Sequence, residues 1–277
     1  MSDIETRGIR LPRMGFGTFM MTGDTCRSAV ESALSVGYRH IDTAARYENE
    51  VDVGAALAES ALPRNELHVT TKVWHDQLAP DAIRRSMGES LRKLKLDQVD
   101  LFLIHWPSPG IDLGKALETL MALKEEGLTR AIGVANFTLP LLKQVVEDIG
   151  APIACNQIEY HVYLDQTPIR TYLADHGVAV TAYCPIAKGE VADDDVLKAI
   201  AARHGATPAQ VALRWLMDQG EVAVIPKAAG RARQAENFGA LSVTLDGEDH
   251  AAIAALPKAR RYVNPAFAPQ WDEPVAA

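Results

Sequence analysis

Short apolar runs rich in β-branched residues recur along the chain, and each is followed by a longer segment whose apolar residues have helical spacing. Most runs begin about 30 residues after the preceding one, which is the length of a strand, a crossover helix and their turns. The continuous apolar character of Val99–Ile104 is typical of a strand covered on both faces. The predicted strands are Met14–Thr18, Tyr38–Ala44, Leu67–Val73, Val99–His105, Arg130–Asn136, Ile153–Tyr160, Ala179–Pro185 and Glu221–Lys227.

Several predicted helices have recognisable ends. Thr207 and Gln210, with Pro208 between them, form the pattern of a capping box at a helix start. Thr138 begins another predicted helix, which Gly150 ends. The long gap before the last strand is expected to hold two helices, over about 193–204 and 207–219.

Eight strand–helix units are the number that closes a parallel barrel. The alternative is an open doubly wound sheet, which a glycine fingerprint after an early strand would favour. The segment Gly15–Met20 lacks the third glycine of that fingerprint, and helical spacing starts only near Thr25. We therefore predict one (β/α)8 TIM barrel, with residues 1–277 as a single domain and no linker.

Composition limits the class of protein further. The 277 residues carry a net charge of −8, and 48% are hydrophobic and 23% charged, as in ordinary globular proteins. The acidic balance argues against a nucleic-acid partner, and no apolar run approaches a membrane span. Three cysteines without a CxxC pair, and an amino terminus without a signal pattern, favour a reduced protein in the cytoplasm. No apolar stripe demands a partner, so a monomer is expected.

Ionisable residues stand at the carboxyl ends of three consecutive predicted strands, where catalytic groups of such barrels lie. They are Asp42, Lys72 and His105, with Tyr47 just beyond the first. Buried charges are costly unless they pair, and Asp42 and Lys72 on neighbouring strands can do so. Each residue alone is compatible with a structural role: a rim salt bridge, a core histidine or a loop aromatic. Four together at one end favour a site.

The four residue types suit protonation of an oxygen atom. A lysine ammonium beside a tyrosine hydroxyl is expected to lower the phenol pKa from about 10, because the positive charge favours the phenolate. A histidine across the site can orient a carbonyl oxygen toward that phenol.

An ordered set of motifs along nearly the whole chain resembles the aldo-keto reductase family. The motifs are Ile41-Asp42-Thr43-Ala44 followed by Tyr47, Thr71-Lys72, His105-Trp106-Pro107, Asn136-Phe137, Asn156-Gln157-Ile158-Glu159 and Ile225-Pro226-Lys227. Within the family, the chain is most similar to bacterial 2,5-diketo-D-gluconate reductases, which also reduce methylglyoxal. The resemblance implies a (β/α)8 barrel that binds NADP(H) and reduces a small-molecule carbonyl substrate, an aldehyde or ketone, to an alcohol.

The resemblance also implies a role for each matching residue. Tyr47 is the expected general acid, Lys72 the group that adjusts its pKa, Asp42 the partner of Lys72, and His105 the group that orients the substrate carbonyl. Tyr183 is expected to stack on the nicotinamide, with Asn136 and Gln157 on its carboxamide. The remaining expected cofactor contacts are Gly17, Thr18, Asp42, Cys184, Ile186, Lys227, Ala228, Arg233, Glu236 and Asn237.

Within that set, Lys227 and Arg233 match the positions that hold the 2′-phosphate of NADP, and Glu236 and Asn237 those near adenine. A solvated basic turn is the alternative for the two cations. Ala228 stands where the family often has serine, so the preference for NADP over NAD is expected to be softer.

Aromatic residues near the strand ends are expected to border the substrate beside Tyr47 and His105. These are Phe19, Trp74 and Trp106, although packing at the barrel end is an alternative for the tryptophans. No metal is expected, because His75 and His161 lack ligands at metal-binding spacing. Two other functions stay open: a nicotinamide-binding sensor with negligible turnover, and a lyase using the Lys72 amine, which pairing with Asp42 disfavours.

Overall fold

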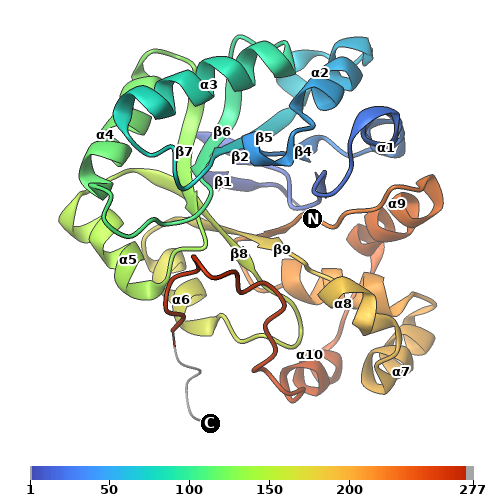
Figure 1. Ribbon diagram of the computed structural model, residues 1–277. Coiled ribbons are helices and arrows are strands. Elements are labelled where there is room, and N and C mark those ends of the chain that lie inside the picture. Colours follow the sequence, from blue (N-terminus) through green and yellow to red (C-terminus); the bar gives the residue numbers. More distant parts are fainter. Residues whose placement is uncertain (1, 273–277) are drawn as a thin grey trace.

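The computed structural model describes residues 2–272, and its centre is a barrel of eight parallel strands (Figure 1). Each strand pairs with the next one along the chain, in the order β3 to β10. A parallel bridge between Met14 and Val224 and a hydrogen bond from the Gly17 amide to the Pro226 carbonyl (3.2 Å) join the first and last strands. The predicted (β/α)8 barrel is confirmed. Its strands are β3 (Gly15–Gly17), β4 (His40–Asp42), β5 (His68–Val73), β6 (Val99–Ile104), β7 (Thr129–Ala135), β8 (Ile153–Glu159), β9 (Ala179–Tyr183) and β10 (Val222–Val224).

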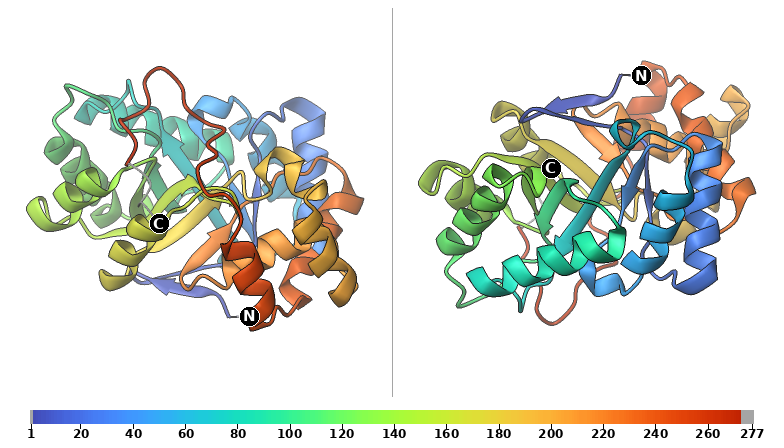
Figure 2. Two further views of the ribbon diagram at one scale, coloured as in Figure 1. Left: turned by 90° about the horizontal axis from the view of Figure 1, so that it is seen from below. Right: turned by 90° about the horizontal axis from the view of Figure 1, so that it is seen from above.

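Helices surround this barrel (Figures 1 and 2), and their buried apolar residues share one core with those of the strands. The predicted capping box is confirmed: the Thr207 side chain accepts from the Gln210 amide, and Gln210 Oε1 accepts from the Thr207 amide. The helices are α1 (Gly23–Val36), α2 (Glu50–Glu59), α3 (Pro80–Leu94), α4 (Leu113–Glu125), α5 (Leu139–Lys143), α6 (Thr167–Asp175), α7 (Asp195–His204), α8 (Pro208–Met217), α9 (Arg231–Phe238) and α10 (Gly247–Ala254).

The structure confirms one expectation about helices and modifies another. The two helices expected before the last strand are α7 and α8, which confirms that prediction. The helix expected after Thr138 is α5, and it continues as a π-helical stretch over Gln144–Asp148 rather than as regular α-helix. The side chain of Thr138 stands at the N-cap position without making a capping hydrogen bond.

A short antiparallel hairpin at the amino terminus was not predicted. Its strands β1 (Ile4–Thr6) and β2 (Ile9–Leu11) have three residues each, too few to show an alternating pattern. The Thr6 hydroxyl donates to the Ala154 carbonyl at 2.8 Å, and this contact fixes the hairpin against the barrel. Figure 2 shows the hairpin at the end of the barrel opposite to the C-terminal segment, so it closes the end away from the predicted site.

The C-terminal segment returns across the other end of the barrel. In Figures 1 and 2 the dark red chain leaves α10 and crosses the strands beside β8. An isolated bridge joins Ala259 to Leu164, and the Leu139 amide donates to Asp272 Oδ2 at 2.9 Å. The segment is therefore attached at both of its ends. Among residues 2–272, no helix combines the length and apolar character needed to cross a bilayer.

Candidate active site

The barrel brings together the four ionisable residues that the sequence singles out. Asp42 ends β4, Lys72 is the penultimate residue of β5, and His105 follows β6. Tyr47 lies in a 3-10 turn, Ala45–Tyr47, directly after β4. Parallel neighbours end at the same side of the sheet, which is why residues up to 63 positions apart along the chain converge here.

A buried ion pair forms the base of this group. Lys72 Nζ lies 2.6 Å from Asp42 Oδ1, and the two side chains are 0% and 1% exposed. The Lys72 ammonium also donates to the Thr43 carbonyl at 2.8 Å, and Gln157 Nε2 donates to Asp42 Oδ2 at 2.7 Å. Such hydrogen bonds offset the loss of hydration that makes unpaired buried charges unstable. The expected pairing of Asp42 with Lys72 is confirmed.

The Tyr47 phenol lies against this ion pair. Lys72 Nζ donates to the Tyr47 hydroxyl at 3.4 Å and lies 4.9 Å from the centre of the ring. His105 is on the other side, with its ring centre 5.5 Å from that of Tyr47 in an edge-to-face arrangement. The Nδ1 atom of His105 is buried and has no hydrogen-bond partner within residues 2–272. An amine, a phenol and an imidazole therefore lie next to one another.

The expected direction of the Tyr47 pKa is wrong. Burial raises the pKa of the Tyr47 phenol well above its ordinary value, and the charge of Asp42 adds to this effect. Burial lowers the pKa of Lys72, against the opposing effect of its pairing with Asp42. Burial also lowers the pKa of His105 well below its ordinary value, with the Lys72 charge contributing. The phenol therefore keeps its proton at neutral pH, and His105 is uncharged.

The residues expected around a nicotinamide ring form one connected group beside Asp42. The Tyr183 hydroxyl donates to Asn136 Oδ1 at 2.7 Å, and Asn136 Nδ2 donates to the His105 carbonyl at 2.9 Å. Gln157 is held by Asp42, as described above. Each amide keeps unused hydrogen-bonding capacity, because a carboxamide has two donor hydrogens and two acceptor lone pairs. Cys184, which directly follows Tyr183, and Ile186, three positions after Tyr183, are half-buried.

The residues expected near the adenosine end lie beyond β10 and in α9. Lys227 and Arg233 are exposed on either side of Gly230, the N-cap of α9, which leaves the first amides of this eight-residue helix without a side-chain cap. Two cations beside free helix amides fit a phosphate group. Ala228 is buried, and its carbonyl accepts a hydrogen bond from Gln234 Nε2 at 3.0 Å. Glu236 is half-buried and Asn237 buried.

Close approach of the chain joins this region to the first strand. A Cβ atom on Gly17 would lie 2.8 Å from the Ile225 carbonyl oxygen, so only glycine fits there. Thr18 is buried, and its hydroxyl donates to the Asp42 carbonyl at 2.9 Å. Gly17 and Thr18 thus bring the β10 segment next to β4. These contacts place the segment that follows β10, which carries Lys227 and Ala228, beside the ends of β3 and β4.

Aromatic side chains surround the phenol and the imidazole. Phe19 is 57% exposed with its ring centre 5.0 Å from that of Tyr47, and Trp74 lies 5.0 Å from His105. Trp106 is buried. Phe267 was missed by the sequence analysis, although it contacts both tryptophans at ring-centre distances of 5.4 Å. No local pattern marks Phe267, because the C-terminal segment that carries it has neither strand nor helix periodicity.

Unusual backbone conformations gather at the same end of the barrel. A positive φ is uncommon outside glycine and costs energy that surrounding contacts must supply. Asn136 (φ 64°) and Cys184 (φ 51°) directly follow β7 and β9, and Glu48 (φ 58°) follows Tyr47. The strands thus end in turns held in defined, unfavourable conformations, as functional sites commonly require.

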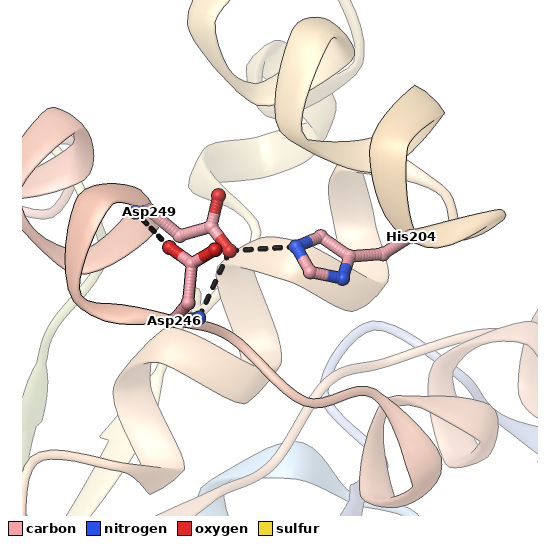
Figure 3. A group of neighbouring side chains, drawn as sticks. All are labelled: His204, Asp246 and Asp249. Atoms are coloured by element: carbon pink, nitrogen blue, oxygen red, sulfur yellow. Dashed lines mark hydrogen bonds and ion pairs between the residues drawn. The ribbon is translucent and has the colours of Figure 1, made fainter.

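A second group of ionisable residues has a structural explanation. His204, Asp246 and Asp249 lie close together between α7 and α10 (Figure 3). The two aspartates form the capping box of α10, and Asp249 also accepts from His204 Nε2 at 2.6 Å and pairs with Arg203. Capping and ion pairing therefore occupy these carboxylates. His161, also considered above as a metal ligand, is buried and bonded to Glu159, and His75 stacks on Phe267.

Comparisons with known proteins agree with this geometry. The model of the aldo/keto reductase family matches residues 13–258. The chain is 46% identical to methylglyoxal reductase DkgB of Escherichia coli O157:H7, covering 95% of this chain and 99% of the relative. It superposes on a structure described as a 2,5-diketo-D-gluconic acid reductase B with a TM-score of 0.95, 42% identity and coverage of 99% and 98%. For the aldose reductase of Schistosoma japonicum the TM-score is 0.90 at 31% identity, with coverage of 95% and 94%.

Proposed function

The chain belongs to the aldo/keto reductase family of oxidoreductases, and we propose that it uses NADPH to reduce small aldehydes and ketones such as methylglyoxal and keto-sugars. The observation that carries this proposal is the contact of the Tyr47 hydroxyl with Lys72 Nζ over the buried Asp42. NADPH, when bound, supplies the hydride to the carbonyl carbon. The chain itself must then hold the carbonyl and give a proton to its oxygen.

We propose Tyr47 as the general acid. A reduction needs this phenol protonated, and the raised pKa keeps it so. The Lys72 ammonium, 3.4 Å away, stabilises the negative charge that forms on the phenol oxygen as the proton leaves. Asp42 holds Lys72 in place and keeps the amine charged, which argues against Schiff-base chemistry at Lys72.

His105 is proposed to orient the substrate. As an uncharged imidazole it can donate one hydrogen bond to a carbonyl oxygen without taking over the role of proton source. Its ring is held between Tyr47 and Trp74 by edge-to-face contacts, so its direction is fixed before a substrate binds. Phe19, Trp74 and Trp106 are proposed to border the substrate beside it.

For the cofactor, we propose that Asn136 and Gln157 bind the carboxamide and that Tyr183 stacks on the nicotinamide. The hydrogen bond between Tyr183 and Asn136 fixes both side chains. Lys227 and Arg233 are proposed to hold the 2′-phosphate, which selects NADPH over NADH. Ala228 offers no hydroxyl there, so we expect a moderate selectivity. The remaining proposed contacts are Gly17, Thr18, Asp42, Cys184, Ile186, Ala228, Glu236 and Asn237.

We also propose that the protein works in the cytoplasm as a monomer with one barrel domain. Cys26, Cys155 and Cys184 are unpaired, which suits a reducing compartment. The large exposed apolar side chains within residues 2–272 are Phe19, Met20, Val51 and Ile111; Phe19 contacts Tyr47 of the proposed site, and Met20 follows it in the chain. The other two lie singly on α2 and near α4, which does not amount to an interface.

Replacing Tyr47 with phenylalanine removes the proposed acid and keeps the ring. We expect Tyr47→Phe to lower kcat for methylglyoxal by about 100-fold or more, with NADPH binding retained. NADPH oxidation followed by absorbance and cofactor fluorescence titration measure the two effects. Tyr172→Phe is the matched control, since its hydroxyl donates only to Glu147 at the surface. Turnover that survives in Tyr47→Phe would exclude the acid role.

The directions of the pKa shifts predict the pH dependence. Tyr47 is protonated below its raised pKa and His105 is uncharged above its lowered pKa, so kcat for reduction should be flat from about pH 6 to 9. Alcohol oxidation needs the phenolate, so its rate should rise with pH across that range. Steady-state kinetics at saturating NADPH or NADP tests both directions. A reduction rate that halves near pH 7 would contradict the assignment.

The double variant Lys227→Ala/Arg233→Ala removes the two proposed phosphate contacts. We expect the KM for NADPH to rise about 10- to 100-fold, because hydrogen bonds between charged groups are strong, while the KM for NADH changes little. Arg231→Ala is the control, since Arg231 is an exposed arginine of the same helix that bonds to Ser35. Equal changes for both cofactors would place the 2′-phosphate elsewhere.

A further inference from the structure

Another buried carboxylate, that of Glu159, lies at the end of β8, two residues after Gln157. Glu159 is 0% exposed, and its Oε1 accepts from the Tyr262 amide at 2.6 Å. Its Oε2 accepts from the Val263 amide at 2.9 Å. The two oxygens of one buried side chain thus bind two consecutive amides about 100 positions further along the chain.

The third donor to Glu159 is a histidine with a defined tautomer. His161 Nε2 lies 3.0 Å from Glu159 Oε1, while His161 Nδ1 accepts from the Tyr163 amide at 3.3 Å. Because Nδ1 accepts, the proton of the ring is on Nε2, which donates to the carboxylate. The nearest cation, Arg261 Nη1, is 4.0 Å from Oε2. Backbone amides therefore supply much of the compensation that this buried charge needs.

These amides belong to a segment that crosses the active-site end of the barrel. We call residues 258–272 the C-terminal strap; it is the dark red chain beside β8 in Figures 1 and 2. On the N-terminal side of the residues that contact Glu159, the Asp165 amide donates to the Lys258 carbonyl and the Arg260 amide to the Tyr163 carbonyl, both at 2.9 Å. At its C-terminal end, the strap is held by the hydrogen bond from the Leu139 amide to Asp272.

The part of the strap that follows Val263 carries aromatic residues to the proposed substrate site. Phe267 contacts Trp74 and Trp106, and Trp271 lies 6.0 Å from Trp106 between ring centres. The Arg261 guanidinium lies 3.8 Å from the centre of the Trp271 ring, so the Glu159 end of the strap also contacts its far end. The position of this aromatic wall thus depends on where residues 261–263 are held.

We propose that Glu159 is a positioning residue, whose buried carboxylate holds the C-terminal strap so that Phe267 and Trp271 border the substrate. Without the strap, the carboxylate would lose two of its three donors and remain at the end of a buried strand. The hydrogen bonds that stabilise the buried Glu159 carboxylate therefore form only when the strap is in place. The kinetic part of this inference rests on the proposed reductase function; the structural part does not.

The inference predicts which substrates depend on Glu159. An aromatic aldehyde such as 4-nitrobenzaldehyde is large enough to contact Phe267 and Trp271, whereas methylglyoxal is small and meets Tyr47 and His105. Displacing the strap should therefore weaken binding of the aromatic aldehyde. The hydride and proton transfers should continue, because Glu159 makes none of the contacts of Tyr47, Lys72 or His105 described above.

Hydrogen exchange of the intact protein tests the structural part. In the wild type, the amides of Tyr262 and Val263 should exchange slowly compared with those of Ala266 and Phe267, for which the structure shows no acceptor within residues 2–272. In Glu159→Gln they should exchange about tenfold faster or more, because a carboxylate acceptor is replaced by an amide that cannot accept from both. Glu190→Gln is the matched control: this exposed glutamate pairs with Arg260 of the same strap and should leave the exchange unchanged. Fast exchange in the wild type would overturn the proposal without any variant.

Kinetics tests the positioning role. For Glu159→Gln we expect the KM for 4-nitrobenzaldehyde to rise about threefold or more, with kcat for methylglyoxal nearly unchanged. Phe267→Ala should reproduce the KM effect without changing exchange at Tyr262 and Val263. Because it leaves the Glu159 contacts intact, this variant also tests the proposal if Glu159→Gln does not fold. Faster exchange with an unchanged KM would contradict the positioning role. Equal losses of kcat for both aldehydes would indicate a role in the reaction itself. Absence of reduction by the wild type would refute the proposed function, while exchange would still decide whether Glu159 holds the strap.

Discussion

The buried ion pair between Lys72 and Asp42 is the interaction on which the proposed site depends. A lysine on a fully covered strand is stable only with its charge compensated, and Asp42, Thr43 and Tyr47 are the groups around its ammonium. The same contacts that make Lys72 tolerable also fix the phenol oxygen beside a positive charge. The contacts that stabilise the buried Lys72 ammonium are therefore also those that the proposed chemistry needs. The barrel brings these groups together because neighbouring strands end at one level.

The buried carboxylates of Asp42 and Glu159 are compensated in different ways. Asp42 is paired with the amine of Lys72 on the neighbouring strand β5 and with the amide of Gln157 on β8, so its surroundings are complete within the barrel. Glu159 takes two of its donors from the backbone of a distant segment. The first arrangement gives a rigid base for proton transfer. The second connects the barrel to the chain that carries Phe267 and Trp271, and so ties substrate shape to barrel geometry.

Periodicity and strand-end chemistry predicted the barrel, the Asp42–Lys72 pair and the gathering of Tyr47 and His105. They succeed because a buried strand and a buried charge each restrict which residues are possible. The hairpin of Ile4–Thr6 and Ile9–Leu11 was missed because three-residue strands carry no period. The pKa of Tyr47 was predicted in the wrong direction because desolvation depends on packing in three dimensions. Phe267 and the proposed role of Glu159 were missed because the contacts that define them span more than 100 residues of sequence.

A double-mutant cycle on Lys72 and Tyr47 tests most directly whether amine and phenol act as one unit. The four proteins are the wild type, Lys72→Met, Tyr47→Phe and the double variant, with kcat for methylglyoxal measured at saturating NADPH and urea unfolding used to establish that each is folded. If Lys72 acts through the phenol, the double variant should be no slower than Tyr47→Phe alone. Losses that multiply, with the double variant slower by the product of the two single effects, would show that the two groups act independently and would contradict the account.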